Sequence, residues 1–129
     1  MSKSKKTLFI SLILLIFITC GCSIFNKAKT YTITIIILNE KNEIYNKKIT
    51  TTETKLIDVL KNLNIKLQTE KSDFGDYIVS LKGLKQSEND EGTYYWDYYI
   101  NNVYSDESIS LCEIEDQTTY KFIYTYHLK

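Results

Sequence analysis

The first regular pattern in the chain is an alternation of apolar and polar positions over residues 30–38. Most residues in this segment are β-branched, which favours an extended strand. The period of two places these side chains on one face: Tyr31, Ile33, Ile35 and Ile37. A polar turn at 39–43 and a weaker alternation at 44–50, with exposed Lys47 and Lys48, predict a second strand returning beside the first.

The pattern then changes from a period of two to a helical period. Leu56, Leu60 and Leu63 recur at i, i+4 and i+7, so one short amphipathic helix is expected over residues 53–63, with its apolar stripe packed on the sheet. Thr50 and Glu53 have the spacing of a capping box.

Short strands are expected next, at 65–70 and 77–81, separated by a turn at 73–76 that contains Gly75. Residues 82–91 are polar and are interpreted as a solvated loop. The acidic residues Glu88, Asp90 and Glu91 lack the Asp-x-Asp-x-Asp-Gly spacing that arranges oxygen atoms around Ca²⁺.

The most unusual stretch is Gly92–Tyr104, which holds the only Trp and five of the 11 Tyr. As a strand it carries rings on both faces. One face has Tyr94, Trp96, Tyr98 and Ile100, and the other has Tyr95, Asp97, Tyr99 and Asn101. One face can serve as core, whereas the second needs another explanation. Asn tolerates positive φ, so Asn101-Asn102 predicts a tight hairpin turn before Val103-Tyr104.

A last strand is expected at residues 118–126, after a polar segment and a short apolar segment at 109–114. Its rings share one face: Tyr120, Phe122, Tyr124 and Tyr126. We expect this strand to lie beside the first one, in the centre of the sheet. Two strands, a helix and further strands predict an α+β fold for residues 30–129, β-grasp-like, with a mixed sheet of about four to six strands packed on one short helix.

These aromatic residues carry a resemblance to a known family. Gly-x-Tyr-Tyr-Trp-x-Tyr-Tyr-Ile-Asn-Asn at 92–102, Ser-Ile-Ser-Leu at 108–111 and Ile-Glu-Asp at 114–116 resemble the transcobalamin-like C-terminal domain family, known in bacteria mostly as a domain of unknown function. The resemblance implies a β-grasp ligand-binding module. Two turns depart from the family pattern and are expected to be looser: Asn101-Asn102 replaces Asn-Gly, and Asp116-Gln117 replaces Gly-Asp.

The N-terminal residues have the pattern of a bacterial lipoprotein signal peptide. Lys3, Lys5 and Lys6 precede the apolar run 8–18, which is shorter than the about 20 residues that a membrane-spanning helix needs. Ile-Thr-Cys-Gly-Cys-Ser at 18–23 resembles a lipobox. Cys22, preceded by Gly21, fits lipidation better than Cys20, preceded by Thr19.

This interpretation divides the chain into a signal peptide at 1–21, a lipidated Cys and tether at 22–29, and the domain at 30–129. An ordinary secretory signal or an uncleaved anchor is the alternative. The tether of seven residues spans at most about 25 Å, so the domain is expected close to the extracytoplasmic face of the bacterial membrane.

Charge and side-chain chemistry exclude several functions. All 16 basic residues are Lys, and three of them lie in the leader, which leaves 13 against 16 acidic residues. A mildly acidic domain is a poor binder of nucleic acid. The single His, His127, stands at a terminus expected to fray. Cys112, the only Cys after the lipidated Cys22, is expected as a half-buried strand residue, so neither an enzyme nor a zinc site is expected.

The remaining hypothesis is a binding module with the aromatic hairpin as its site. The ligand-contact candidates are Tyr95, Trp96, Tyr98, Tyr99, Asn101, Asn102 and Tyr104, although Trp96 and Tyr98 fit a core role equally well. The resemblance implies cobalamin or a corrinoid-like ligand, held together with a partner such as a membrane transporter component or a corrinoid-binding protein. A cell-surface interaction or structural module with no small ligand is the alternative.

Overall fold

The computed structural model describes residues 28–129, and Cys22 and the leader lie outside the described residues. The elements are β1 (Tyr31–Asn39), β2 (Asn42–Thr51), α2 (Leu56–Asn62), β3 (Gln68–Ser72), β4 (Gly75–Leu81), β5 (Leu84–Lys85), β6 (Ser87–Glu88), β7 (Gly92–Ile100), β8 (Val103–Ser105) and β9 (Thr118–Leu128).

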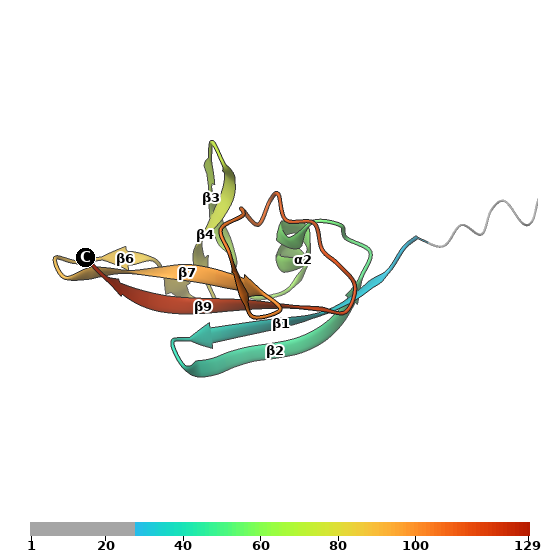
Figure 1. Cartoon of the computed structure of the whole chain (residues 1–129), viewed down its shortest axis with the longest axis horizontal. Helices are drawn as coiled ribbons and strands as arrows, with labels where there is room; N and C mark the ends of the chain where they lie inside the picture. The colour runs from blue at the N-terminus through green and yellow to red at the C-terminus, as the bar shows by residue number, and fades with distance from the viewer. Residues whose placement is uncertain (1–27) are drawn as a thin grey trace, which may run out of the picture.

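Six of these strands form one mixed sheet. Its order is β2-β1-β9-β7-β6, and β8 also pairs with β7. β9 is parallel to β1 and antiparallel to β7, which confirms that the last strand lies beside the first in the centre of the sheet. β3, β4 and β5 form a second, small sheet. In Figure 1, α2 and the β3–β4 hairpin lie on the same side of the large sheet.

The core lies between the large sheet and α2. The alternation in β1 buries the expected face, with Ile33, Ile35 and Ile37 at most 1% exposed. Leu56 and Leu60 of α2 pack against this face and are fully buried, as is Phe122 of β9. Burying such side chains provides the main stabilisation of a domain of this size, at about 1.5–3 kcal/mol for each.

Over residues 28–129 the fold is mostly β with one short helix, as expected, and its large sheet is mixed. The helix has one turn fewer than predicted, and a second small sheet stands next to it on the same face. The arrangement is therefore sandwich-like and not clearly β-grasp.

The predicted capping box is not formed. The helix begins after Lys55, which makes no side-chain cap, and its first N–H groups donate to carbonyl groups of a distant turn. Leu56 N–H donates to Cys112 O (2.9 Å) and Ile57 N–H to Ile109 O (3.1 Å). The predicted apolar segment 109–114 thus supplies both buried side chains and the cap. Cys112 lies in this turn instead of a strand, and it is buried, not half-buried.

Strand boundaries differ in two places. The strand predicted at 65–70 begins at Gln68, because Ile65 instead packs into the core. The predicted loop 82–91 contains β5 and β6, each of two residues, which is too short to produce an alternation in sequence.

Both turns that depart from the family pattern are tight. Asn101 and Asn102 have φ of 48° and 66°, as a two-residue hairpin turn requires, and Gln117 has φ of 58°. Gln117 N–H donates to Thr32 O (2.7 Å), and Asp116 Oδ1 accepts from Thr32 N–H (2.6 Å). The expectation of looser turns was wrong because Asn and Gln adopt the positive φ without glycine.

The hairpin turn provides a first prediction. Asn101 Oδ1 accepts a hydrogen bond from Thr119 N–H (2.9 Å), whereas Asn102 Oδ1 accepts one only from the exposed Lys121 Nζ (2.7 Å). Asn101→Ala should lower the free energy of unfolding by about 2 kcal/mol, and Asn102→Ala by about 1 kcal/mol, because only the first loses a backbone hydrogen bond in addition to the strain at positive φ. Urea denaturation measures both, and equal losses would contradict this assignment.

Candidate ligand-binding cavity

Aromatic side chains on the core-facing side of β7 and β9 form a ladder. The register pairs Tyr98 with Phe122, Trp96 with Tyr124 and Tyr94 with Tyr126. The ring centroids of these pairs are 5.6, 5.3 and 4.7 Å apart, typical of favourable aromatic contacts. The buried end of the ladder belongs to the core, whereas Trp96 and the rings beyond it are only partly buried.

The polar atoms of the ladder hold the segment 84–89 against it. Trp96 Nε1 donates to Leu84 O (2.9 Å), and the Tyr124 hydroxyl donates to Lys85 O (2.7 Å). The segment that was predicted to be a solvated loop is thus partly fixed to the sheet by rings that are apolar in body and polar at the tip.

The opposite face of β7 holds an Asp-His pair. His127 Nε2 lies 3.0 Å from Asp97 Oδ2, and the Tyr95 ring stacks on the imidazole with 3.9 Å between centroids and 6° between planes. Asp97 is only 8% exposed. The expectation that His127 frays was wrong, because β9 extends to Leu128 and both neighbours fix the ring.

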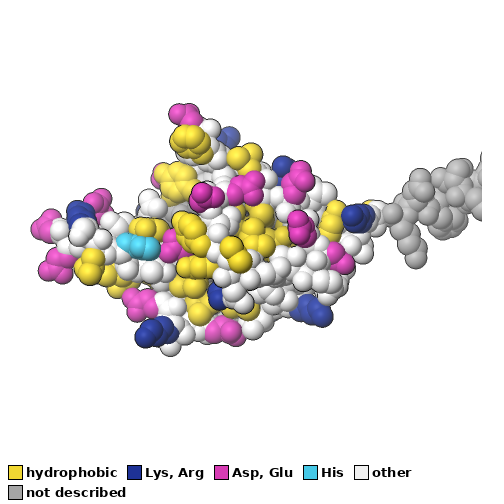
Figure 2. Space-filling model, in the orientation of Figure 1, with side chains coloured by type: hydrophobic (Ala, Val, Ile, Leu, Met, Phe, Trp, Pro, Cys, Tyr) yellow, Lys and Arg dark blue, Asp and Glu magenta, His cyan; other side chains and the backbone are white. Residues whose placement is uncertain are grey.

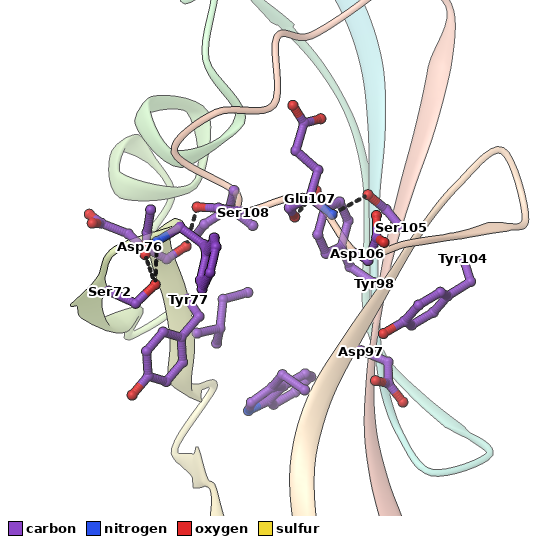
Figure 3. Close-up of a pocket in the computed structure, with 15 residues that line it drawn as sticks. Ser72, Asp76, Tyr77, Asp97, Tyr98, Tyr104, Ser105, Asp106, Glu107 and Ser108 are labelled. Carbon is purple, nitrogen blue, oxygen red and sulfur yellow. Dashed lines mark hydrogen bonds between the residues drawn. The ribbon is translucent and has the colours of Figure 1, made fainter.

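A cavity of about 250 Å³ lies between the β3–β4 hairpin on one side and β7 and β8 on the other. Residues 105–109 close one end. Figure 3 shows Asp76 and Tyr77 on the hairpin side of the opening, and Tyr98 and Tyr104 on the other side. The Tyr98 hydroxyl donates to Glu107 O (2.6 Å), so this strand and the closing segment are joined.

Two serines attach the hairpin to the closing segment. Ser108 Oγ donates to Asp76 O (2.6 Å), and Ser110 Oγ accepts from Asp76 N–H (2.9 Å). The two hydroxyl groups also bond to each other (2.8 Å). Gly75 makes the approach possible, because a Cβ there would lie 2.7 Å from Ser110 Oγ, too close for any contact. We call these contacts the serine clasp.

The rim of the cavity is aromatic and acidic. Phe74 at the hairpin turn is 85% exposed, Tyr104 of β8 58% and Tyr77 41%. Asp76, Asp106 and Glu107 are also among the lining residues, as is Asp97, whose carboxylate is paired with His127 on the opposite face of β7. Figure 2 shows acidic side chains beside the hydrophobic surface next to the hairpin. The arrangement can hold the apolar body of a ligand between its aromatic side chains.

A second cavity of about 390 Å³ adjoins the first. Both are lined by Tyr77, Ile78 and Trp96, and the second extends past Tyr95 to β6. Together the two cavities form one trough along β7, and we use this name below. Trp96 is the residue at its middle.

The structure distributes the predicted site residues over two places. Trp96, Tyr98 and Tyr104 line the first cavity, and Tyr95 the second. Tyr99 packs edge-on against Tyr104 with 5.8 Å between centroids and lies under Lys121 Nζ, and Asn101 and Asn102 form the turn. Ligand contact by these last three residues stays a prediction.

Sequence reasoning missed the hairpin side of the trough. Phe74 stands in the polar turn Ser72-Asp-Phe-Gly-Asp76, and an aromatic residue in such a turn is a signal of an exposed contact residue. Asp106 and Glu107 were assigned to a polar segment with no function. Nothing in the sequence spacing indicates that residues 74–78 and 104–109 meet.

Burial sets the ionisation of two groups near the trough. The pKa of Tyr98 is raised above its ordinary value of 10.0, chiefly by burial. The pKa of the Cys112 thiol is raised for the same main reason. In residues 28–129, no group of three His, Cys, Asp or Glu side chains is placed to hold a metal ion. The same residues include no helix long and apolar enough to cross a membrane.

Comparisons with known proteins place the chain in a family. Residues 53–125 match the model described as "Domain of unknown function (DUF4430)", which is more than half of the chain. The chain belongs to the DUF4430 family. No curated protein matches this DUF4430 chain in sequence.

Solved structures with similar folds include two of particular interest. One is a candidate metal-binding protein from Ruminococcus gnavus ATCC 29149, at 13% identity and a TM-score of 0.63, covering 75% of this chain and 98% of that one. The other is haptocorrin in complex with Cbi, at 16% identity and a TM-score of 0.67, covering 81% of this chain but 27% of haptocorrin. At these identities the likeness shows the fold alone. The transcobalamin-like fold that the aromatic motif predicts is confirmed.

The serine clasp provides a second prediction, with a matched control. Gly75 and Gly83 have φ of 103° and 82°, but a Cβ at Gly83 would meet no atom within 4 Å. Gly83→Ala should lower the free energy of unfolding by about 1 kcal/mol through backbone strain, and Gly75→Ala by at least about 2 kcal/mol because it also separates the clasp. Urea denaturation of both variants measures this, and a smaller loss for Gly75→Ala would refute the role of the clasp.

The buried phenol provides a third prediction. Because Tyr98 keeps its proton more firmly in the folded than in the unfolded chain, its contribution to stability is complete below pH 10 and is lost as pH rises through the raised pKa. Tyr98→Phe should cost about 1 kcal/mol at pH 7 through the lost bond to Glu107 O, and should reduce the decline above pH 10. Urea midpoints between pH 7 and 11 measure both effects. An equally steep alkaline decline in the variant would be inconsistent with this role.

Proposed function

We propose that this DUF4430 protein is a membrane-anchored binding lipoprotein that holds a small ligand in the trough along β7. The observation that carries the proposal is the concave site itself, with aromatic rings on both of its walls. Small-molecule sites are concave and mostly apolar, with a few polar groups that fix orientation. We propose no catalytic reaction for this site.

Cobalamin or a corrinoid-like molecule is the ligand we favour. Haptocorrin, which has a similar fold over 27% of its length, was solved in complex with Cbi, a cobalamin analogue. The two cavities of the trough, about 250 and 390 Å³, lie below or near the lower end of the size of pockets that enclose a drug-sized ligand, so a corrinoid would rest on this domain by one face. A partner protein would then cover the other face.

The lipid anchor at Cys22 is part of the same proposal. The short tether 23–29 would keep the domain near the extracytoplasmic face of the cell membrane, close to a membrane transporter component or a membrane-bound corrinoid-binding protein. Such a partner is the one we expect to complete the site.

A protein-interaction or structural module is the second candidate. Exposed apolar side chains favour it: Val103 is 69% and Leu111 53% exposed, in addition to Phe74 and Tyr104. Exposed apolar surface of this kind marks contact sites. Because the aromatic members border a concave surface, the small-ligand function has the stronger support.

Tryptophan fluorescence tests the proposal directly, since Trp96 is the only Trp and lines both cavities. Titration of the protein with cobalamin or cobinamide, corrected for absorption by the corrinoid, should give a saturable change with Kd in the micromolar range or tighter. Phe74→Ala should weaken binding about tenfold, because the exposed ring would lose its contact with the ligand.

Leu111→Ala is the matched control, because Leu111 is exposed but does not line the trough. It should leave Kd within about twofold. Calorimetry with Trp96→Phe checks that the optical change reports binding. A flat titration with every corrinoid, alone and with candidate partners, would eliminate the corrinoid function and favour the interaction module.

A further inference from the structure

The large sheet ends in one long strand with a free edge. β2 is the first strand in the sheet order, and within residues 28–129 it pairs only with β1. In Figure 1 it forms the lower border of the sheet. The strand is 10 residues long, and most of its residues are exposed. A strand edge of this length presents a row of backbone donors and acceptors to another chain.

The neighbouring strand shows which backbone groups lie on this edge. Thr32 N–H and Thr32 O both bond to the turn before β9, so they point away from β2. Thr32 is paired with Thr50, and in an antiparallel pair that exchanges no bonds both residues point outward. Thr50, Lys48 and Asn46 therefore present their N–H and C=O groups to the free edge. Their side chains lie on the face away from the core, because the adjacent Tyr45 packs against the core.

A β-bulge brings Glu43 to the same face. The pairing of β1 with β2 skips Ile44, so Tyr45 and Glu43 face successive residues of β1. In a regular strand, Glu43 and Lys48 are five positions apart and would lie on opposite faces. Because the bulge removes one position from the alternation, they share one face and one edge. Lysines and bulges commonly protect an edge against pairing, but here they give it a charge pattern that complements itself.

We propose that two copies of this chain pair through their β2 edges, antiparallel and centred on Asn46. In this register Asn46 faces the same residue of the second copy across a twofold axis. Lys48 faces Glu43 of the second copy, and this pair of opposite charges occurs twice. Lys47 faces Tyr45 of the second copy, and its Nζ lies 5.5 Å from the Tyr45 ring of its own chain, a contact that an aromatic ring favours. Registers centred on Lys47 or Lys48 would place two lysines opposite each other, which destabilises a strand pair.

Such a dimer goes beyond the small-ligand function and does not depend on it. β1 and β9 separate β2 from β7, so the pairing joins two large sheets edge to edge and leaves both troughs open. Because only a strand edge is buried, which is small for a protein interface, the dimer should be weak and should form as the protein concentration rises.

Sedimentation equilibrium of the full chain in mild detergent tests the pairing. Between about 10 µM and about 1 mM the protein should shift from monomer towards dimer. Glu43→Lys or Lys48→Glu alone should weaken association about fivefold, because each places two like-charge pairs in the interface. An equimolar mixture of the two variants should associate about as well as the unsubstituted chain, because every facing pair then has opposite charges. Glu91→Lys, at an exposed residue before β7, makes the same change of charge as Glu43→Lys and should leave association within about twofold.

Disulfide formation tests the register independently. Opposite residues of a bonded antiparallel pair have Cα atoms about 5.5 Å apart, which suits a disulfide, so Asn46→Cys should give a covalent dimer under mild oxidation. Thr50→Cys is the matched control, because Thr50 is exposed on the same edge and face. The two copies of residue 50 would lie about 27 Å apart, so this variant should give no more covalent dimer than the unsubstituted chain.

The outcomes distinguish the dimer from its register. Monomer at every concentration would overturn the dimer. A dimer that is insensitive to both single charge changes, or that is not restored by mixing the two variants, would overturn the register. Equal cross-linking of Thr50→Cys and Asn46→Cys would overturn it as well. None of these results affects the small-ligand function, which the corrinoid titration tests separately.

Discussion

β9 pairs with a neighbouring strand along each of its two edges, and the rest of the structure depends on this constraint. β9 is parallel to β1 and antiparallel to β7, so it is a central strand of the sheet, and its alternate side chains are aromatic. Near its start, Tyr120 and Phe122 fill the core with the isoleucines of β1. β9 continues past the helix, and the later rings of the ladder stand on a part of the sheet that α2 does not cover (Figure 1). A surface with partly buried rings beside the core is the direct result.

The trough exists because other segments reach this surface without covering it. Carbonyl groups of Leu84 and Lys85 accept hydrogen bonds from the ladder, and the serine clasp holds the β3–β4 hairpin at a distance from β7. β6 and β8 each pair with only one end of β7. The same strand thus provides packing at one end and an open, ring-lined surface in its middle, which is why the core and binding interpretations of Trp96 are both partly valid.

The sequence predicts what depends on local periodicity. The strands at both ends of the domain, the short helix, the faces of the aromatic strand and the Asn101-Asn102 turn all follow from patterns within a few residues. The cap of α2 does not, because its acceptors are the carbonyl groups of Ile109 and Cys112, more than 50 positions away. The far wall of the trough does not either, since Ser108 meets Asp76 across 32 positions. His127 was misjudged from its place near the terminus, because only tertiary structure brings it to Asp97.

Hydrogen exchange of backbone amides with and without saturating cobinamide tests the central claim most directly. The account predicts slower exchange in two separate segments, 74–78 and 104–109, together with Trp96, because the ligand would lie between the two walls. Exchange at Asn101 and Asn102 should change little. Protection confined to the Asn101-Asn102 turn, or to neither wall of the trough, would contradict the account.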